Sequence, residues 1–140
     1  MNPVVLDASV VAAAFFQEDE AQAARALLVS DRELLAPDLI VAEVANVIWK
    51  RHGHGEVDEV EGRRLLADVL HLPLHLTPSS ELAGAALELA LRTRRTVYDC
   101  LYLALAVKTK SAMVTGDKRL VRALADGPLA KHAIWIGDHR

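Results

Sequence analysis

Short apolar runs alternate with longer helix-forming segments along the chain, and this alternation restricts the fold more than any other feature of the sequence. The runs that predict strands are residues 4–6, 34–36, 74–76, 112–115 and 134–136. The segments that predict helices are residues 9–16, 19–28, 39–51, 58–70, 80–92, 98–108 and 118–124. Strands that alternate with helices form a parallel sheet with helices on both faces. The sequence therefore predicts an α/β fold.

Local signals add detail at three places. Residues 74–76 lie between Pro73 and Pro78. Proline cannot donate a hydrogen bond to a neighbouring strand, so we expect this run at an edge of the sheet. Ser9 and Asp19 are expected to cap the first two helices, because their side chains can accept hydrogen bonds from free backbone N–H groups.

Length and composition favour one domain that spans residues 1–140. Hydrophobic residues make up 52% of the chain, which is enough for a core without disulfides. The single cysteine, Cys100, excludes an intrachain disulfide and agrees with a reducing compartment. We find no basic leader at the N-terminus and no apolar run of the roughly 18 residues that a membrane span needs. We therefore expect a cytoplasmic protein.

Four of the 19 acidic residues lie in apolar surroundings. Asp7 and Asp117 follow predicted strands, and ligands of parallel sheets bind beyond the carboxyl ends of the strands. Glu43 and Asp99 lie within apolar helical segments. Carboxylates that gather at one place repel one another unless a positive charge compensates them. Mg²⁺ or Mn²⁺ is the natural compensating ion, because both prefer oxygen ligands.

Each of these acids also has an ordinary structural explanation. Asp7 and Asp117 could simply cap the helices that follow them. Asp99 has the spacing of a capping box behind a threonine. Glu43 and Asn46 could form the narrow polar stripe of a largely buried helix, since they are three residues apart. It is the combination of four such acids in one predicted domain that favours a metal site.

Four segments of the sequence resemble the PIN-domain family, and specifically the VapC-type toxins of bacterial toxin–antitoxin pairs. These segments are VVLDASV with Asp7, LIVAEVANVIWK with Glu43, TVYDCLYLALA with Asp99, and MVTGDKRL with Asp117. They occur in the family's order and cover nearly the whole chain. The resemblance implies a three-layer α/β/α sandwich with a central parallel sheet. It also implies an endoribonuclease that depends on Mg²⁺ or Mn²⁺, an RNA substrate, a cognate antitoxin protein and a homodimer.

The four acids are the expected catalytic residues, and three of them are expected to bind metal. We expect Asp7 and Asp99 to bind an ion directly, and Asp117 to bind a second ion or a water molecule. Glu43 would bind through water or act as a general base. The polar residues expected to support these ligands are Ser9, Asn46 and Thr115.

The charge of the chain does not by itself indicate a protein that binds RNA. The formal net charge is −3, whereas proteins that bind nucleic acid usually carry excess positive charge. Two basic clusters flank the acids and could hold RNA phosphates, although both could also be ordinary solvated helix ends. They are Arg92, Arg94 and Arg95 before Asp99, and Lys118, Arg119 and Arg122 after Asp117.

Other functions fit the sequence less well. A haloacid-dehalogenase-like phosphatase needs a second acid two residues after the first, and Ser9 occupies that position. A receiver domain needs a pair of adjacent acids near the first strand, whereas Asp7 stands alone. The alternative that stays open is a non-catalytic PIN-like module that binds RNA or protein.

Overall fold

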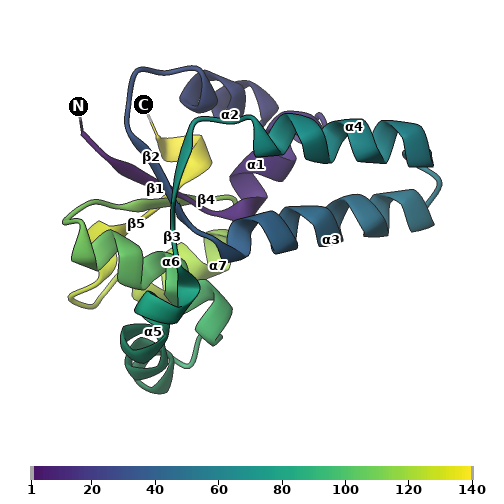
Figure 1. Ribbon diagram of the computed structural model, residues 1–140. Helices are drawn as coiled ribbons and strands as arrows, with labels where there is room; N and C mark the ends of the chain where they lie inside the picture. The colour runs from purple at the N-terminus through teal and green to yellow at the C-terminus, as the bar shows by residue number, and fades with distance from the viewer. Residues whose placement is uncertain (1, 140) are drawn as a thin grey trace.

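The computed structural model describes residues 2–139 and has the predicted alternation of strands and helices (Figure 1). The strands are β1 (Val4–Leu6), β2 (Leu34–Pro37), β3 (Leu74–Thr77), β4 (Met113–Thr115) and β5 (Ala133–Trp135). The helices are α1 (Ala8–Phe15), α2 (Ala21–Leu28), α3 (Leu39–Gly53), α4 (Glu59–Leu70), α5 (Ser79–Thr93), α6 (Val97–Lys108) and α7 (Lys118–Leu124). Two short 3₁₀ turns, η1 (Ala130–His132) and η2 (Ile136–Asp138), flank β5.

The five strands form one parallel sheet in the order β3-β2-β1-β4-β5. β1 is the central strand, and Val5 pairs with Leu35 of β2 on one side and with Met113 of β4 on the other. β3 lies at an edge, as its flanking prolines predicted. Because all strands run the same way, the residues that follow β1 and β4 emerge at the same end of the sheet.

The core has two layers because the side chains of β1 alternate between the two faces of the sheet. Val5 packs into the larger cluster, together with α3, α5 and α6. Val4 and Leu6 pack into the other cluster, together with α1, α2 and Ile136. The sheet is therefore covered on both faces, which confirms the predicted three-layer α/β/α sandwich (Figure 1).

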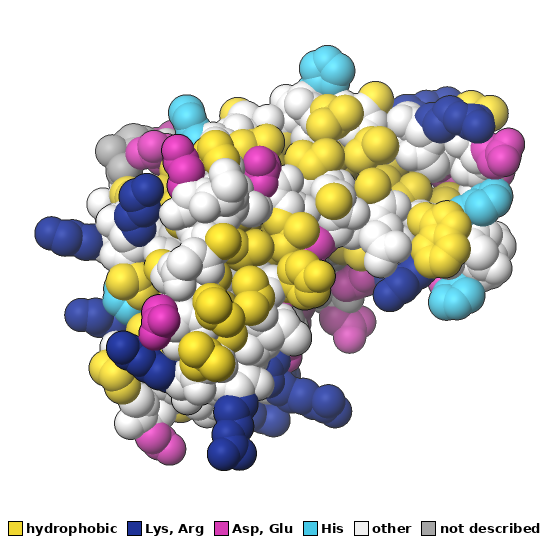
Figure 2. All heavy atoms as spheres, turned by 60° about the horizontal axis from the view of Figure 1, so that its bottom comes forward, with side chains coloured by type: hydrophobic (Ala, Val, Ile, Leu, Met, Phe, Trp, Pro, Cys, Tyr) yellow, Lys and Arg dark blue, Asp and Glu magenta, His cyan; other side chains and the backbone are white. Residues whose placement is uncertain are grey.

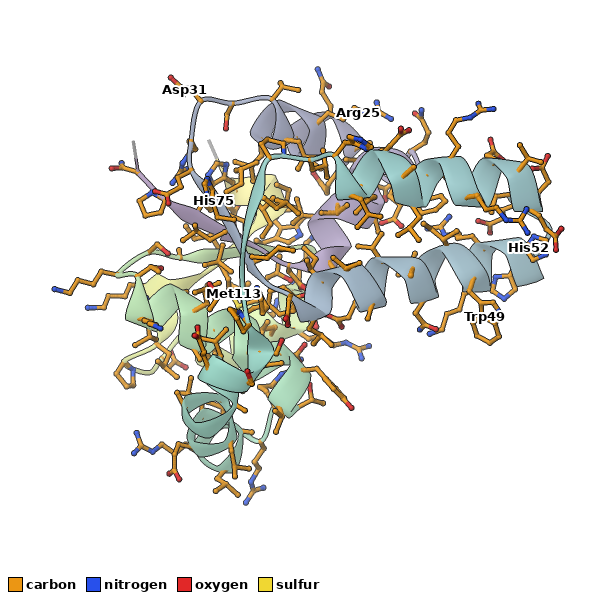
Figure 3. All side chains as sticks on the ribbon, in the orientation of Figure 1. Arg25, Asp31, Trp49, His52, His75 and Met113 are labelled. Carbon is orange, nitrogen blue, oxygen red and sulfur yellow. The ribbon has the colours of Figure 1, made fainter. Side chains whose placement is uncertain are left out.

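Helices α3 and α4 form an antiparallel pair that projects from the body of the protein (Figure 1). The two helices approach closely where Gly62 of α4 meets Ile48 of α3, since a Cβ atom at Gly62 would lie 3.3 Å from Ile48 Cγ2. Trp49 and His52 point away from the body at the end of α3 (Figure 3), and Trp49 is 68% exposed.

The first two helix starts differ from the predicted ones. α1 begins at Ala8, so Ser9 lies inside the helix, and its hydroxyl bonds to Asp7 instead of capping the helix. The prediction that Asp19 caps the second helix was also wrong, because α2 begins at Ala21 with Glu20 in the cap position and no capping side chain. Among residues 2–139, no helix is long and apolar enough to cross a membrane.

Candidate active site

Asp7 leaves the central strand at the end of the sheet where β1 and β4 both finish. It occupies the N-cap position of α1 but makes no capping hydrogen bond. Its Oδ2 atom instead accepts hydrogen bonds from Thr115 Oγ1 at 2.6 Å and from Ser9 Oγ at 3.1 Å. The carboxylate is thus fixed by side chains of two strand ends, and the capping explanation for Asp7 does not hold.

Ser9 joins the two strand ends more closely than its place in α1 suggests. Its Oγ atom accepts a hydrogen bond of 2.9 Å from the backbone N–H of Gly116. A Cβ atom at residue 116 would lie 3.3 Å from this oxygen, so glycine permits the close approach. Ser9 and Thr115 therefore both hold the Asp7 carboxylate by hydrogen bonds.

Asp117 has two roles, one for each carboxylate oxygen. Oδ1 caps α7 by accepting hydrogen bonds from the backbone N–H groups of Arg119 and Leu120 at 2.9 and 3.2 Å. Oδ2 points the other way and accepts a hydrogen bond of 3.3 Å from Arg95. The capping explanation for Asp117 is correct, but it accounts for only half of the carboxylate.

Asp99 lies in the first turn of α6, and Thr96 caps that helix. Thr96 Oγ1 accepts the backbone N–H of Asp99 at 3.1 Å, and the Asp99 carboxylate does not complete a capping box among the described residues. The carboxylate faces Arg95, with 3.5 Å between Asp99 Oδ2 and Arg95 Nη2. Asp99 is thus available for a role other than capping.

Glu43 approaches the site from α3 and is held by a tyrosine of α6. The hydroxyl of Tyr102 donates a hydrogen bond of 2.5 Å to Glu43 Oε1. Tyr102 is only 1% exposed, whereas Glu43 is partly exposed, so the hydrogen bond joins the core to the site. Burial and the contact with Glu43 raise the pKa of Tyr102 far above its usual range, so the hydroxyl remains a donor.

The four carboxylates are close enough for their charges to influence one another. Burial raises the pKa values of Asp7, Glu43 and Asp99. The charge of Asp99 raises the pKa of Asp7 further, and the charge of Asp117 does the same for Asp99. The negative charge of Asp7 also acts on Glu43. The site thus has more negative charge than its surroundings compensate.

The chemistry of these residues fits a divalent cation. Carboxylate oxygens are preferred ligands of Mg²⁺ and Mn²⁺, and an ion would lower the raised pKa values. As they stand, however, no three Asp, Glu, His or Cys side chains within residues 2–139 are arranged to hold an ion. The Arg95 guanidinium lies between Asp99 and Asp117 and supplies a positive charge there. The carboxylate ligands are of the type that a divalent ion prefers. The Arg95 guanidinium lies between two of them.

Comparison with known proteins agrees with this fold and identifies its family. A family model described as the PIN domain matches residues 4–125, which contain all four carboxylates. The chain belongs to the PIN-domain family. It is 34% identical to ribonuclease VapC3 of Pyrobaculum aerophilum over 119 residues, which are 84% of this chain and 91% of that protein. It is 31% identical to ribonuclease VapC9 of Mycobacterium tuberculosis over 117 residues, 84% of this chain and 87% of that one.

Two solved structures have the same PIN-domain fold. PAE2754 from Pyrobaculum aerophilum aligns with a TM-score of 0.72 and 24% identity, over 97% of this chain and 85% of that one. VapBC2 from Rickettsia felis, bound to a DNA fragment from its promoter, aligns with a TM-score of 0.62 and 14% identity, over 95% of this chain and 98% of that one. At these identities the alignments bear on the fold alone, and they agree with the parallel sheet.

The expected residues do not all join the site of this PIN domain. Asn46 lies exposed on α3, and no hydrogen bond of its side chain occurs among the described residues. The side chain of Arg95 points towards the acids, whereas its neighbour Arg94 is exposed. Tyr102 was missed from the sequence as a partner of Glu43. Its position three residues after Asp99, on the same face of α6, was the available signal.

Proposed function

We propose that this protein is an endoribonuclease that depends on Mg²⁺ or Mn²⁺ and that it is the toxin of a toxin–antitoxin pair. The observation that carries the proposal is the gathering of four acids, three with raised pKa values, where β1 and β4 end. Two relatives bear the name ribonuclease, which supports RNA as the substrate.

Under this proposal, each side chain of the site has a distinct task in hydrolysis. A bound divalent cation supplies positive charge to the transition state of phosphodiester cleavage and makes water more acidic. Thr115 and Ser9 hold Asp7 in place as a ligand, and Asp117 keeps Oδ2 free of the helix cap. Tyr102 occupies only Oε1 of Glu43, which leaves Oε2 to accept a proton from water.

The surface beside the acids has room for a nucleotide. A cavity of about 860 Å³ begins at Ser9 and Asp117. Lys118 and Arg119 contribute positive charge to its lining, and the acidic residues 18–20 line it as well. These two basic side chains are the candidates for phosphate contacts, although acidic residues outnumber them in this lining.

Removal of the metal is expected to stop RNA cleavage. The protein should degrade a mixture of cellular RNAs in Mg²⁺ or Mn²⁺, lose this activity in EDTA, and regain it when excess Mn²⁺ is added. Gel analysis of RNA over time measures all three states. Cleavage that persists unchanged in EDTA contradicts the metal requirement. A folded protein that cleaves no RNA with either ion contradicts the enzyme proposal and favours a non-catalytic PIN-like module that binds RNA or protein.

We also propose a protein antitoxin as the partner, since a toxin nuclease must be restrained in its host. The likeness of the fold to VapBC2 supports this proposal. The acidic site would attract an Arg or Lys side chain of the inhibitor. Co-purification from the native source tests the partner, and recovery of the protein alone, with no inhibitor encoded nearby, counts against it.

We propose a two-fold symmetric homodimer because apolar side chains remain exposed around α5 and the start of α6. Leu87, Leu91 and Tyr98 are 50%, 70% and 62% exposed. Figure 2 brings the α5 side of the protein forward and shows hydrophobic side chains across the middle of this face, with Lys and Arg at its margins. Exposed apolar surface of this kind marks interfaces. Light scattering at micromolar concentration should give the mass of a dimer, and the mass of a monomer would refute it.

A further inference from the structure

Arg95 lies at the junction of α5 and α6, and the backbone there directs its side chain into the carboxylates. Arg94 has the left-handed conformation, with φ of 61°, and ends α5. The backbone N–H of Arg95 then donates to Thr93 Oγ1 at 3.2 Å, which anchors the start of the side chain. Apart from its contacts with the two acids, Arg95 is anchored at its backbone, so rotation of its own side-chain bonds would carry the guanidinium out of the site.

The guanidinium bridges two acids with one nitrogen. Arg95 Nη2 lies 3.3 Å from Asp117 Oδ2 and 3.5 Å from Asp99 Oδ2. The Nε atom of Arg95 is buried and has no hydrogen-bond partner among the described residues. A buried donor without a partner costs free energy. The attraction of the two carboxylates offsets this cost and keeps Arg95 in the site.

We propose that Arg95 is the resident counter-cation of the metal-free site and that a divalent ion must displace it to bind Asp99 and Asp117. The inference rests on the proposed function, because it concerns the same ion. The guanidinium lies against Asp99 Oδ2 and Asp117 Oδ2, so an ion held by either carboxylate would be repelled by its positive charge. The guanidinium therefore competes with the ion, and the protein binds metal more weakly than its carboxylates alone would.

Removal of the competing charge should strengthen metal binding. Arg95→Gln is expected to bind Mn²⁺ about five- to tenfold more tightly than the native protein, because two partly exposed ion pairs no longer need to be broken. Isothermal titration calorimetry with MnCl₂ measures this affinity. Arg94→Gln is the matched control, since Arg94 is adjacent but exposed, and its affinity should equal the native one.

Thermal melts provide a second readout that a merely structural role would not produce. In EDTA, Arg95→Gln should melt below the native protein, because Asp99 and Asp117 lose their counter-charge. In excess Mn²⁺ this difference should narrow or disappear, since the ion replaces the guanidinium. A structural role alone predicts the same loss in both conditions and an unchanged Mn²⁺ affinity, and that result would overturn the proposal.

A conservative variant keeps the test decisive if Arg95→Gln does not fold. Arg95→Lys retains the charge but presents a compact ammonium in place of the planar fork. Arg95→Lys should bind Mn²⁺ more tightly than the native protein and Arg94→Gln do. It should bind Mn²⁺ less tightly than Arg95→Gln does. If the native protein cleaves RNA but both Arg95 variants bind Mn²⁺ with the native affinity, this inference is refuted and the proposed function is not. Absence of both Mn²⁺ binding and RNA cleavage in all variants refutes the proposed function.

Discussion

Asp7→Asn is expected to lower the rate of RNA cleavage by at least about a hundredfold while the fold stays intact. Asp7 receives hydrogen bonds from Ser9 and Thr115, and its charge interacts with those of Asp99 and Glu43. Asparagine has the same shape, but it lacks the charge that binds a metal ion. Both hydroxyls donate to the same oxygen, Oδ2, so the amide oxygen of asparagine can take that position and keep both contacts.

The fold of Asp7→Asn should survive because burial already disfavours the ionised form. The pKa of Asp7 is raised mainly by burial, against the lowering effect of its two hydroxyl partners. Circular dichroism and a thermal melt establish that the variant is folded, and gel assays give the cleavage rate. Asp68→Asn on α4 is the matched control, because Asp68 is exposed and far along the chain from the site. Undiminished cleavage by folded Asp7→Asn would falsify the assignment of the site.

Asp99→Asn is expected to abolish cleavage and yet to make the metal-free protein more stable, by roughly 1 kcal/mol. Burial raises the pKa of Asp99, and the charge of Asp117 adds to this effect, while Arg95 opposes it. When the pKa of a carboxyl group is raised in the folded state, its ionised form destabilises the folded protein relative to the unfolded chain. Replacement by a neutral side chain of the same shape removes this cost.

The direction of the pH dependence follows from the same shift. When the carboxyl pKa is higher in the folded state, the resulting stability is fully present at a pH below the pKa of the unfolded state. It is lost as the pH rises through the pKa of the folded state. In EDTA, native Asp99 therefore gains a proton and stability as the pH falls from neutral. The stability difference between Asp99→Asn and the native protein should shrink over that range. A difference that grows on acidification contradicts the assigned shift.

Metal addition separates a ligand from a residue that only supports a helix. The free energy of unfolding of the native protein should rise by about 2.7 kcal/mol at a metal concentration one hundred times Kd, and that of Asp99→Asn much less. Thr96 already caps α6, so the variant keeps its cap. If Asp99 acted mainly on the helix dipole, the variant would melt lower in EDTA, by up to about 1 kcal/mol, and respond normally to metal. Thermal melts in EDTA and in excess Mn²⁺ distinguish these results.

The sequence predicted the strands and helices well because their signals are local. β3 is an example, since Pro73 and Pro78 predicted both its bounds and its edge position. The start of α1 was less certain because Asp7, Ala8 and Ser9 are all acceptable near a helix N-terminus. Which of these residues caps the helix depends on Thr115 and Gly116, which lie more than a hundred positions away.

The candidate site was predicted by residue type, and its internal contacts were not. Four acids in apolar segments were visible in the sequence, whereas their pairing depends on the packing of α3 against α6 and of β1 beside β4. The position of Arg95 is the clearest case. It belonged to a basic cluster that could hold RNA phosphates or simply form a solvated helix end. In the structure it follows the left-handed residue Arg94, and its guanidinium lies against Asp99 and Asp117.

The central place of β1 in the sheet has a consequence during synthesis on the ribosome. Asp7 is made well before Thr115, its partner, which follows 108 positions later. Asp117 is made later still, and Ser9 waits as long for the N–H group of Gly116. A nascent chain that ends before β4 therefore contains three of the acids but has no assembled nuclease centre. Truncated products that end before β4 should consequently leave cellular RNA intact.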